Sequence, residues 1–285
     1  MSKTGKDLKI KRVLAGDKHL GGFISNAAYN IRPEVAQEVV TGQHELALVK
    51  ATYVPISLNL TIKLQRLENF IADYDGTNKF GFVSAQGALA TYDLYYTDVI
   101  DALKFADCIT NSCRVTIPQR GAITAEVEVF PKTQTNQAYG SDPTPITEDP
   151  MTKTNLETLT LTLGGTDVKD IKADFSSVVL GVTHSIQRVP LGTSLPPSEQ
   201  IQRQTVYTAR IVRALKTQSW TGSTYAGTPE DLIVQINDNQ DTPRKTKFTF
   251  ADMIVNSHVR PIRELNMIEE TIECIGKSLV LEAGA

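Results

Sequence analysis

The chain has 285 residues, of which 41% are hydrophobic and 21% are charged, a composition typical of a folded protein rather than a disordered one. Its formal net charge of −3 argues against a general nucleic-acid coat, because such proteins cluster Lys and Arg against phosphates. Cys108, Cys113 and Cys274 are too few for a disulfide framework, so we expect reduced thiols in a protein made in the cytoplasm.

Strand patterns dominate the sequence in chain order. Hydrophobic and polar residues alternate over residues 58–65, 126–129, 158–163 and 272–274, which predicts strands with one dry and one wet face. Many β-branched threonines favour further strands over residues 173–186, 204–215, 231–237 and 245–255. We therefore predict a mainly-β fold of β-sandwich or barrel-like domains.

A few short helices are also predicted. Residues 33–40 begin at a proline, residues 64–74 place apolar residues at helical spacing, and residues 98–106 form a third short candidate. For residues 105–112 we prefer a strand, because the related segment that starts at residue 245 looks extended.

The middle of the chain reads as a linker. Residues 133–154 hold three prolines, one glycine and almost no large aliphatic side chains, so this segment cannot build a core. We expect a first β domain over residues 1–135, a Pro/Thr-rich linker over residues 136–154 and a second β domain over residues 155–285.

The two halves are related in sequence. Residues 105–132 and 250–277 are identical at ten of 28 positions without a gap, including the pairs Phe105/Phe250, Asp107/Asp252 and Asn111/Asn256. A weaker match pairs residues 61–66 with residues 208–213, at an offset of 147 residues instead of 145. These matches predict a tandem duplication.

Catalytic and metal-binding patterns are missing from the sequence. None of the four histidines has metal-ligand spacing, and no phosphate loop or nucleophile motif occurs. The Asp107/Asp252 and Asn111/Asn256 pairs could be catalytic, but hydrogen bonds that satisfy backbone groups are the favoured interpretation. Cys113 and His258 differ at one equivalent position, which speaks against a shared catalytic role. We therefore expect no enzyme activity, no cofactor and no metal.

The second half carries a resemblance to a known family. Residues 170–178 (DIKADFSSV) lead into an extended segment ending in LGT at 191–193, followed by PPSEQIQ at 196–202 and a long strand over 205–215. A loop with DLIVQI at 231–236 and a closing GKSLVLE at 276–282 complete the order. This order resembles the tail tube proteins of tailed bacteriophages and related contractile injection machines.

The resemblance implies a structural subunit of a viral tail, assembled in the host cytoplasm. Subunits would stack as rings into a hollow conduit for DNA ejection, either as trimers with pseudo-sixfold symmetry or as hexamers. Implied partners are a tail sheath, a baseplate and a tape-measure protein, with genomic DNA only in transit and no membrane. Exposed acidic residues that could face the lumen are Glu126, Glu128, Glu269, Glu270 and Glu273.

Two other functions remain open at this point. One is another part of a virion or injection machine, such as a sheath, baseplate or capsid-decoration protein. The other is a carbohydrate-binding or hydrolytic β-sandwich, which would need clustered exposed aromatic residues or carboxylate pairs. Aromatic residues make up only 7% of the chain, which disfavours this second alternative.

Overall fold

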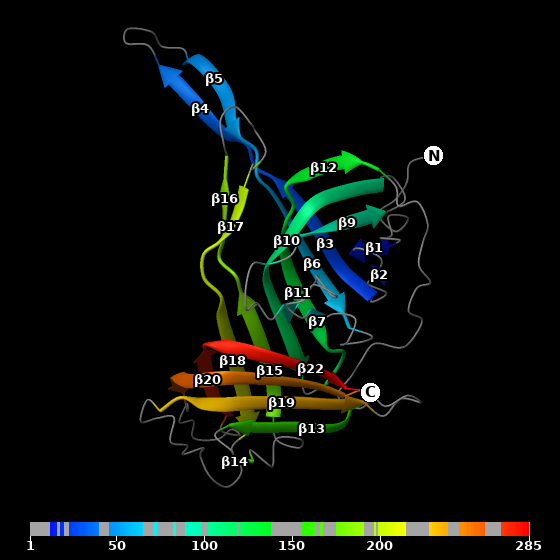
Figure 1. The fold of residues 1–285 in the computed structure, drawn as a ribbon, viewed down its shortest axis with the longest axis vertical. Helices are drawn as coiled ribbons and strands as arrows, with labels where there is room; N and C mark the ends of the chain where they lie inside the picture. The colour runs from blue at the N-terminus through cyan, green and yellow to red at the C-terminus, as the bar shows by residue number, and fades with distance from the viewer. Residues whose placement is uncertain are drawn as a thin grey trace.

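The computed structural model describes residues 12–15, 18–19, 23–39, 46–64, 71–72, 82–83, 89, 91–97, 102–118, 120–137, 156–163, 166–167, 175–190, 197, 199–214, 228–238, 245–259 and 269–284. Every regular element in these residues is a strand, so the mainly-β prediction is confirmed (Figure 1). The few short helices that we predicted do not occur among these residues.

The first repeat, which ends at residue 137, contains two sheets that share one long strand. The outer sheet has the order β2 (Lys18–His19), β1 (Arg12–Ala15), β9 (Tyr92–Thr97), the start of β10 (Ala102–Pro118) and β12 (Thr133–Asn136). The inner sheet has the order β3 (Phe23–Ile31), β6 (Ile56–Lys63), β11 (Thr124–Phe130) and the end of β10. The small pair β7 (Ile71–Ala72) and β8 (Phe82–Val83) is parallel.

The second repeat, which starts at residue 156, has the same strand order. Its outer sheet runs β14 (Thr166–Asp167), β13 (Leu156–Leu163), β19 (Glu230–Asp238), the start of β20 (Lys245–Val259) and β22 (Ser278–Gly284). Its inner strands are β15 (Phe175–Thr183), β18 (Val206–Ala214), β21 (Glu269–Gly276) and the end of β20.

Each repeat also carries a two-stranded hairpin at the same place in its strand order. In the first repeat β4 (Glu34–Val39) pairs with β5 (Leu46–Tyr53), and in the second β16 (Ile186–Val189) pairs with β17 (Glu199–Gln202). The β4–β5 hairpin projects away from the body of the molecule, whereas β16–β17 runs alongside it (Figure 1).

Pairing of β10 with β15 joins the repeats into one continuous inner sheet. Its eight strands lie in the order β3, β6, β11, β10, β15, β18, β21 and β20, and each neighbouring pair is antiparallel. One face of this sheet packs against the outer sheets, and we call it the dry face; the opposite face is the wet face.

The core follows from the period-two patterns. On β6, Leu58, Leu60 and Ile62 are buried on the dry face, and Phe105 and Phe250 are buried in the outer part of β10 and β20. Alternate residues of an antiparallel strand point to opposite faces, so one face can be apolar while the other stays polar.

The structure corrects two of the predicted elements. The helix over residues 33–40 is wrong, because residues 34–39 form β4 and pair with β5. Residues 102–106 belong to β10 instead of a helix. For the helix predicted over 64–74, Ile71 and Ala72 lie in β7, while residues 65–70 and 73–74 lie outside the described residues. A starting proline is a weak local signal, and cross-strand pairing overrides it.

The segment read as a linker begins inside a strand. Residues 133–136 form β12, which pairs with the start of β10 in the first outer sheet. Residues 138–154 of the predicted linker lie outside the described residues.

The upstream part of the repeat has a different offset from the one predicted. Lys63 lies opposite Thr124 and Ala214 lies opposite Glu269, so the two inner ladders correspond at an offset of 151 residues rather than 147. The difference of four residues is even, and it therefore leaves every side chain on the same face of its strand. Alternation alone could not detect this error.

Candidate assembly interface

The joint between the two repeats is a complete antiparallel ladder. It runs from Ser112 opposite Thr183 to Pro118 opposite Ser177. The dry-face side chains along both strands are buried: Cys113, Val115, Ile117, Val178, Leu180 and Val182. The joint therefore combines ladder hydrogen bonds with a continuous apolar core.

Asn111 makes hydrogen bonds to both repeats at the end of this joint. Its carbonyl accepts from the His184 N–H at 2.7 Å and its side-chain Oδ1 accepts from the Ile186 N–H at 3.0 Å. Its Nδ2 donates to Glu128 Oε2 at 2.6 Å. Asn111 lies at a bulge in the β10–β11 ladder, which leaves its backbone free to serve the other repeat. The bond from the Ile186 N–H to its Oδ1 is of the kind favoured from the sequence, in which a side chain satisfies a backbone group.

Asp107 and Asp252 occupy equivalent bends of the long strands. Their φ angles are 51° and 53°, in the left-handed region, where β10 and β20 pass from the outer to the inner sheet. Each backbone N–H donates to an aspartate Oδ1 of the preceding outer strand at 3.3 Å, Asp93 for Asp107 and Asp231 for Asp252. Aspartate tolerates this conformation better than most residues, so the same residue at both bends has a structural reason.

The β16–β17 hairpin packs over the first repeat. The Arg188 guanidinium lies 4.0 Å from the centre of the Phe130 ring and donates to the Ile56 carbonyl at 2.7 Å. Gln200 Nε2 donates to the Phe130 carbonyl at 2.7 Å. Ile109 and Phe130 are buried in this region. The hairpin is therefore an arm that packs against the neighbouring repeat and hydrogen-bonds to it.

The free edge of β3 is the counterpart of the joined edge of β15. Among the described strands, β3 pairs only with β6. At the 151-residue offset, Tyr29 and Ile31 correspond to Leu180 and Val182. Tyr29 and Ile31 are 46% and 42% exposed, whereas Leu180 and Val182 are 0% and 1% exposed. The same positions are thus apolar in both repeats but covered in only one.

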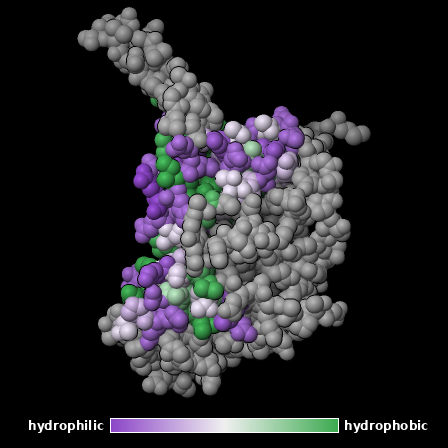
Figure 2. Space-filling view, in the orientation of Figure 1, coloured by the Kyte–Doolittle hydropathy of each residue, from purple (hydrophilic) through white to green (hydrophobic). Residues whose placement is uncertain are grey.

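The opposite end of the inner sheet shows the same contrast. Within the described strands, the last part of β20 pairs on one side only, with β21. Ile254 and Ile275 are exposed, while their counterparts Ile109 and Phe130 are buried near the β16–β17 arm. In the view of Figure 2, the described part of the surface shows hydrophobic side chains among hydrophilic ones.

The predicted lumen residues divide between the two faces. The register places Glu126, Glu128, Glu269 and Glu273 on the wet face, but Glu270 is fully buried on the dry face. The expectation that Glu270 is an exposed acidic residue is therefore wrong. Successive residues of a strand point to opposite faces, so the pair Glu269 and Glu270 in the sequence did not show which carboxylate turns inward.

The wet face carries nearly balanced charge. The described inner strands place three cations there, Lys63, Arg114 and Arg210, together with the four glutamates named above. Arg210 and Glu273 form an exposed ion pair at 3.3 Å. Serines and threonines fill many of the other positions, and the face is hollowed over β10, β15, β18 and β21.

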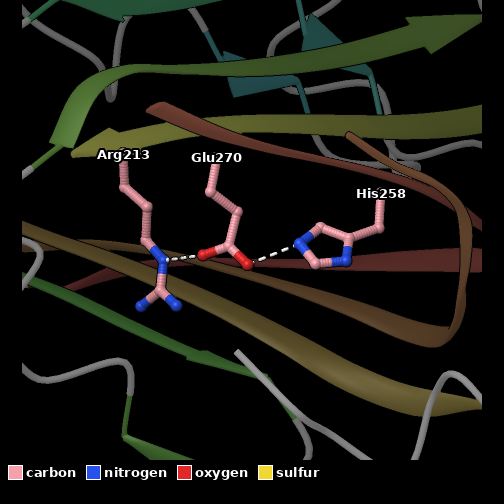
Figure 3. A network of polar contacts seen from close by, with 3 residues as sticks. All are labelled: Arg213, His258 and Glu270. Atoms are coloured by element: carbon pink, nitrogen blue, oxygen red, sulfur yellow. Dashed lines mark hydrogen bonds and ion pairs between the residues drawn. The ribbon is translucent and has the colours of Figure 1, made fainter. Parts of the chain in front are cut away.

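Glu270 is the buried centre of a polar triad that sequence reasoning missed. Arg213 Nε donates to Glu270 Oε2 at 2.6 Å, and His258 Nε2 contacts Glu270 Oε1 (Figure 3). The three residues come from the adjacent strands β18, β20 and β21, and Glu270 is 0% exposed. The only sequence signal was that the corresponding first-repeat residues, Ile62, Ala125 and Cys113, are apolar.

Burial also shifts the pKa values of His184 and of the three cysteines. Burial lowers the pKa of His184 to about 4. Its Nδ1 lies 3.1 Å from Thr205 Oγ1, and its Nε2 has no hydrogen-bond partner among the residues that the structure describes. Burial raises the pKa of Cys274 to about 12 and that of the Cys108 and Cys113 thiols as well. The described cysteines are free thiols without nucleophilic activation.

The described residues contain no cluster of three or more His, Cys, Asp or Glu placed to hold a metal ion. Among the same residues, no helix is long and apolar enough to cross a membrane. No protein-family model matches the chain, and no curated protein matches it.

Proposed function

We propose that the chain is a structural subunit that joins head to tail into a ring, and that the rings stack into the hollow tube of a viral tail. One observation carries this proposal: the β10–β15 joint exists within the chain, while the corresponding edges of β20 and β3 are free among the described strands. The tube and its DNA-conducting role extend the resemblance in strand order described above.

The repeat specifies how two copies would pair. β20 corresponds to β10 at an offset of 145 residues, and β3 corresponds to β15 at an offset of 151. Ser257 would then lie opposite Arg32 of a second copy, and His258 opposite Ile31. The eight inner strands alternate in direction, so β20 of one copy and β3 of the next run antiparallel, as β10 and β15 do.

The projecting β4–β5 hairpin supplies the second contact. It corresponds to the β16–β17 arm, which hydrogen-bonds to the Ile56 and Phe130 carbonyls of the first repeat. On a neighbouring copy it would cover Ile254 and Ile275, the exposed counterparts of Ile109 and Phe130. Head-to-tail contacts of this kind form closed rings when the rotation closes, and closure removes the free edges. Three chains would supply six repeats.

The wet face would form the wall of the channel. Its described charges nearly balance, and hydroxyl side chains occupy much of the rest. Such a wall offers few cations to neutralise phosphates, so a duplex would bind weakly and remain mobile. Guidance of DNA would require shape and rigidity, without a catalytic step.

Disulfide trapping tests the joint directly. Ser257→Cys with Arg32→Cys should link neighbouring copies, because facing residues in antiparallel strands lie at disulfide distance. The matched control is Ser112→Cys with Thr183→Cys, the same pair within one chain. Non-reducing gels should show a ladder that ends at the covalent trimer for the first variant and only intrachain links for the control.

Electron microscopy of the same preparations tests the assembly. Stacked rings with a central channel are expected for the wild type, and weak duplex binding is expected at low salt. A ladder ending at six chains would replace the trimer with a hexamer. If the control variant forms its intrachain disulfide but the Ser257→Cys, Arg32→Cys variant forms no interchain disulfide, the proposed joint is overturned. Particles without a channel would favour a sheath, baseplate or decoration protein, and submicromolar duplex binding would overturn the weakly binding wall.

A further inference from the structure

The Arg213–Glu270–His258 triad lies at the end of the inner sheet that the described strands form. It spans β18, β21 and β20, and β20 is the last strand of that sheet. The carboxylate of Glu270 accepts from Arg213 and contacts the His258 ring, so a polar network centred on the buried Glu270 extends inward from the edge strand (Figure 3).

The fold does not require charge at these positions. In the first repeat the same three places hold Ile62, Ala125 and Cys113, each about fully buried. Those residues lie beside the β10–β15 joint, where Cys113 faces Val182. An apolar set therefore packs well in this architecture and supports a complete strand joint.

A buried ionic network usually gives no stability over a well-packed apolar set. Its value lies in specificity, and inward-pointing charges are one of the devices by which sheet proteins protect edge strands from indiscriminate pairing. The joined edge needs no such device, because β15 covers it permanently. Among the described strands, the outer edge of β20 is uncovered, and the exposed residues Ile254 and Val259 lie on this strand.

We infer that the Arg213–Glu270–His258 triad guards the β20 edge against unspecific β pairing until the β3 edge of a second copy covers it. This inference rests on the proposed function. In the β20–β3 pairing, His258 lies opposite the aliphatic Ile31, which can pack on the ring while Glu270 holds its nitrogen. Pairing of β20 with β20 of another copy would instead bring two of these networks together in a desolvated joint, which is unfavourable.

Replacing the triad by the apolar residues of the first repeat tests whether the triad protects the β20 edge. The triple variant Arg213→Ile, Glu270→Ala, His258→Cys gives the second repeat the residues of the first. Arg210→Gln with Glu273→Gln is the matched control, because it removes an Arg–Glu pair from the same two strands on the wet face and leaves those exposed positions polar. Cooperative thermal melting by circular dichroism checks that both variants fold.

Sedimentation velocity and thioflavin fluorescence then measure off-pathway association of freshly purified chains. We expect a several-fold larger aggregated fraction and a lower yield of rings for the triple variant, with wild-type behaviour for the control. His258→Cys alone leaves the Arg213–Glu270 contact in place, and it should show a smaller increase; it serves as the test if the triple variant does not fold.

Two outcomes would overturn the inference: a folded triple variant that stays as monodisperse as the wild type, or an equal increase in the control. If the triple variant does not fold, a His258→Cys variant that aggregates no more than the wild type would do the same. Absence of rings from the wild type would instead count against the proposed function, so the two failures can be told apart.

Discussion

The edges of β3 and β15 have the same place in their repeats and opposite surroundings. Both carry apolar side chains on the dry face, but only those of β15 are covered, by β10 of the same chain. The equivalent residues of the second repeat, Leu180 and Val182, are covered by the end of the long strand β10 from the neighbouring repeat. If the proposed assembly forms, β20 of a second copy would cover Tyr29 and Ile31 in the same way.

The largest expected effect comes from placing a charge at the two equivalent edges. Val182→Asp should destabilise the chain by about 4 kcal/mol or more, because an unpaired carboxylate would be buried in the joint. Ile31→Asp should change the stability of the free chain by only about 0.5 kcal/mol, yet abolish rings. Urea denaturation and sedimentation measure the two effects, with Ile31→Val as the control that should still assemble. Rings formed by Ile31→Asp would contradict the comparison.

A smaller effect concerns pH at the covered joint. His184, fully buried there, has a folded-state pKa of about 4, below its ordinary value of 6.5. The unfolded chain therefore binds more protons between these values, so this contribution to stability is complete above pH 6.5 and is lost as the pH falls toward 4. The loss approaches about 3 kcal/mol.

Urea denaturation of the wild type and of His184→Gln at several pH values isolates this contribution, since other groups titrate in both proteins. The difference between the two proteins should shrink as the pH falls. Parallel pH profiles of the two proteins would show that His184 is not the source.

The smallest effect separates the two asparagines. Asn111→Ala removes two side-chain hydrogen bonds at the covered joint and should destabilise the chain by about 1–2 kcal/mol. Asn256 is exposed at the free edge, so Asn256→Ala should leave the free chain nearly unchanged and lower only the stability of rings. Thermal melting of the free chain and dilution of assembled rings measure these changes. If both variants lowered the stability of the free chain equally, the contrast between the covered site of Asn111 and the exposed site of Asn256 would be contradicted.

Part of this structure was predictable from sequence. Period two along residues 58–65 predicted a strand, and the gapless match predicted equivalent positions for Asn111 and Asn256, which the strand pairings place at corresponding bulges. The helix over residues 33–40 was wrong because the proline signal is local, whereas the β4–β5 pairing links residues that are distant in the chain.

The sequence by itself determined the β class and the relation between the halves, because both depend on periodicity and identity along the chain. Only the tertiary structure decided which edges are joined, that Glu270 turns inward while Glu269 does not, and that Arg213, Glu270 and His258 meet. These facts depend on register between strands that lie far apart in sequence. A shift of one residue reverses the faces, and a shift of four leaves the pattern unchanged.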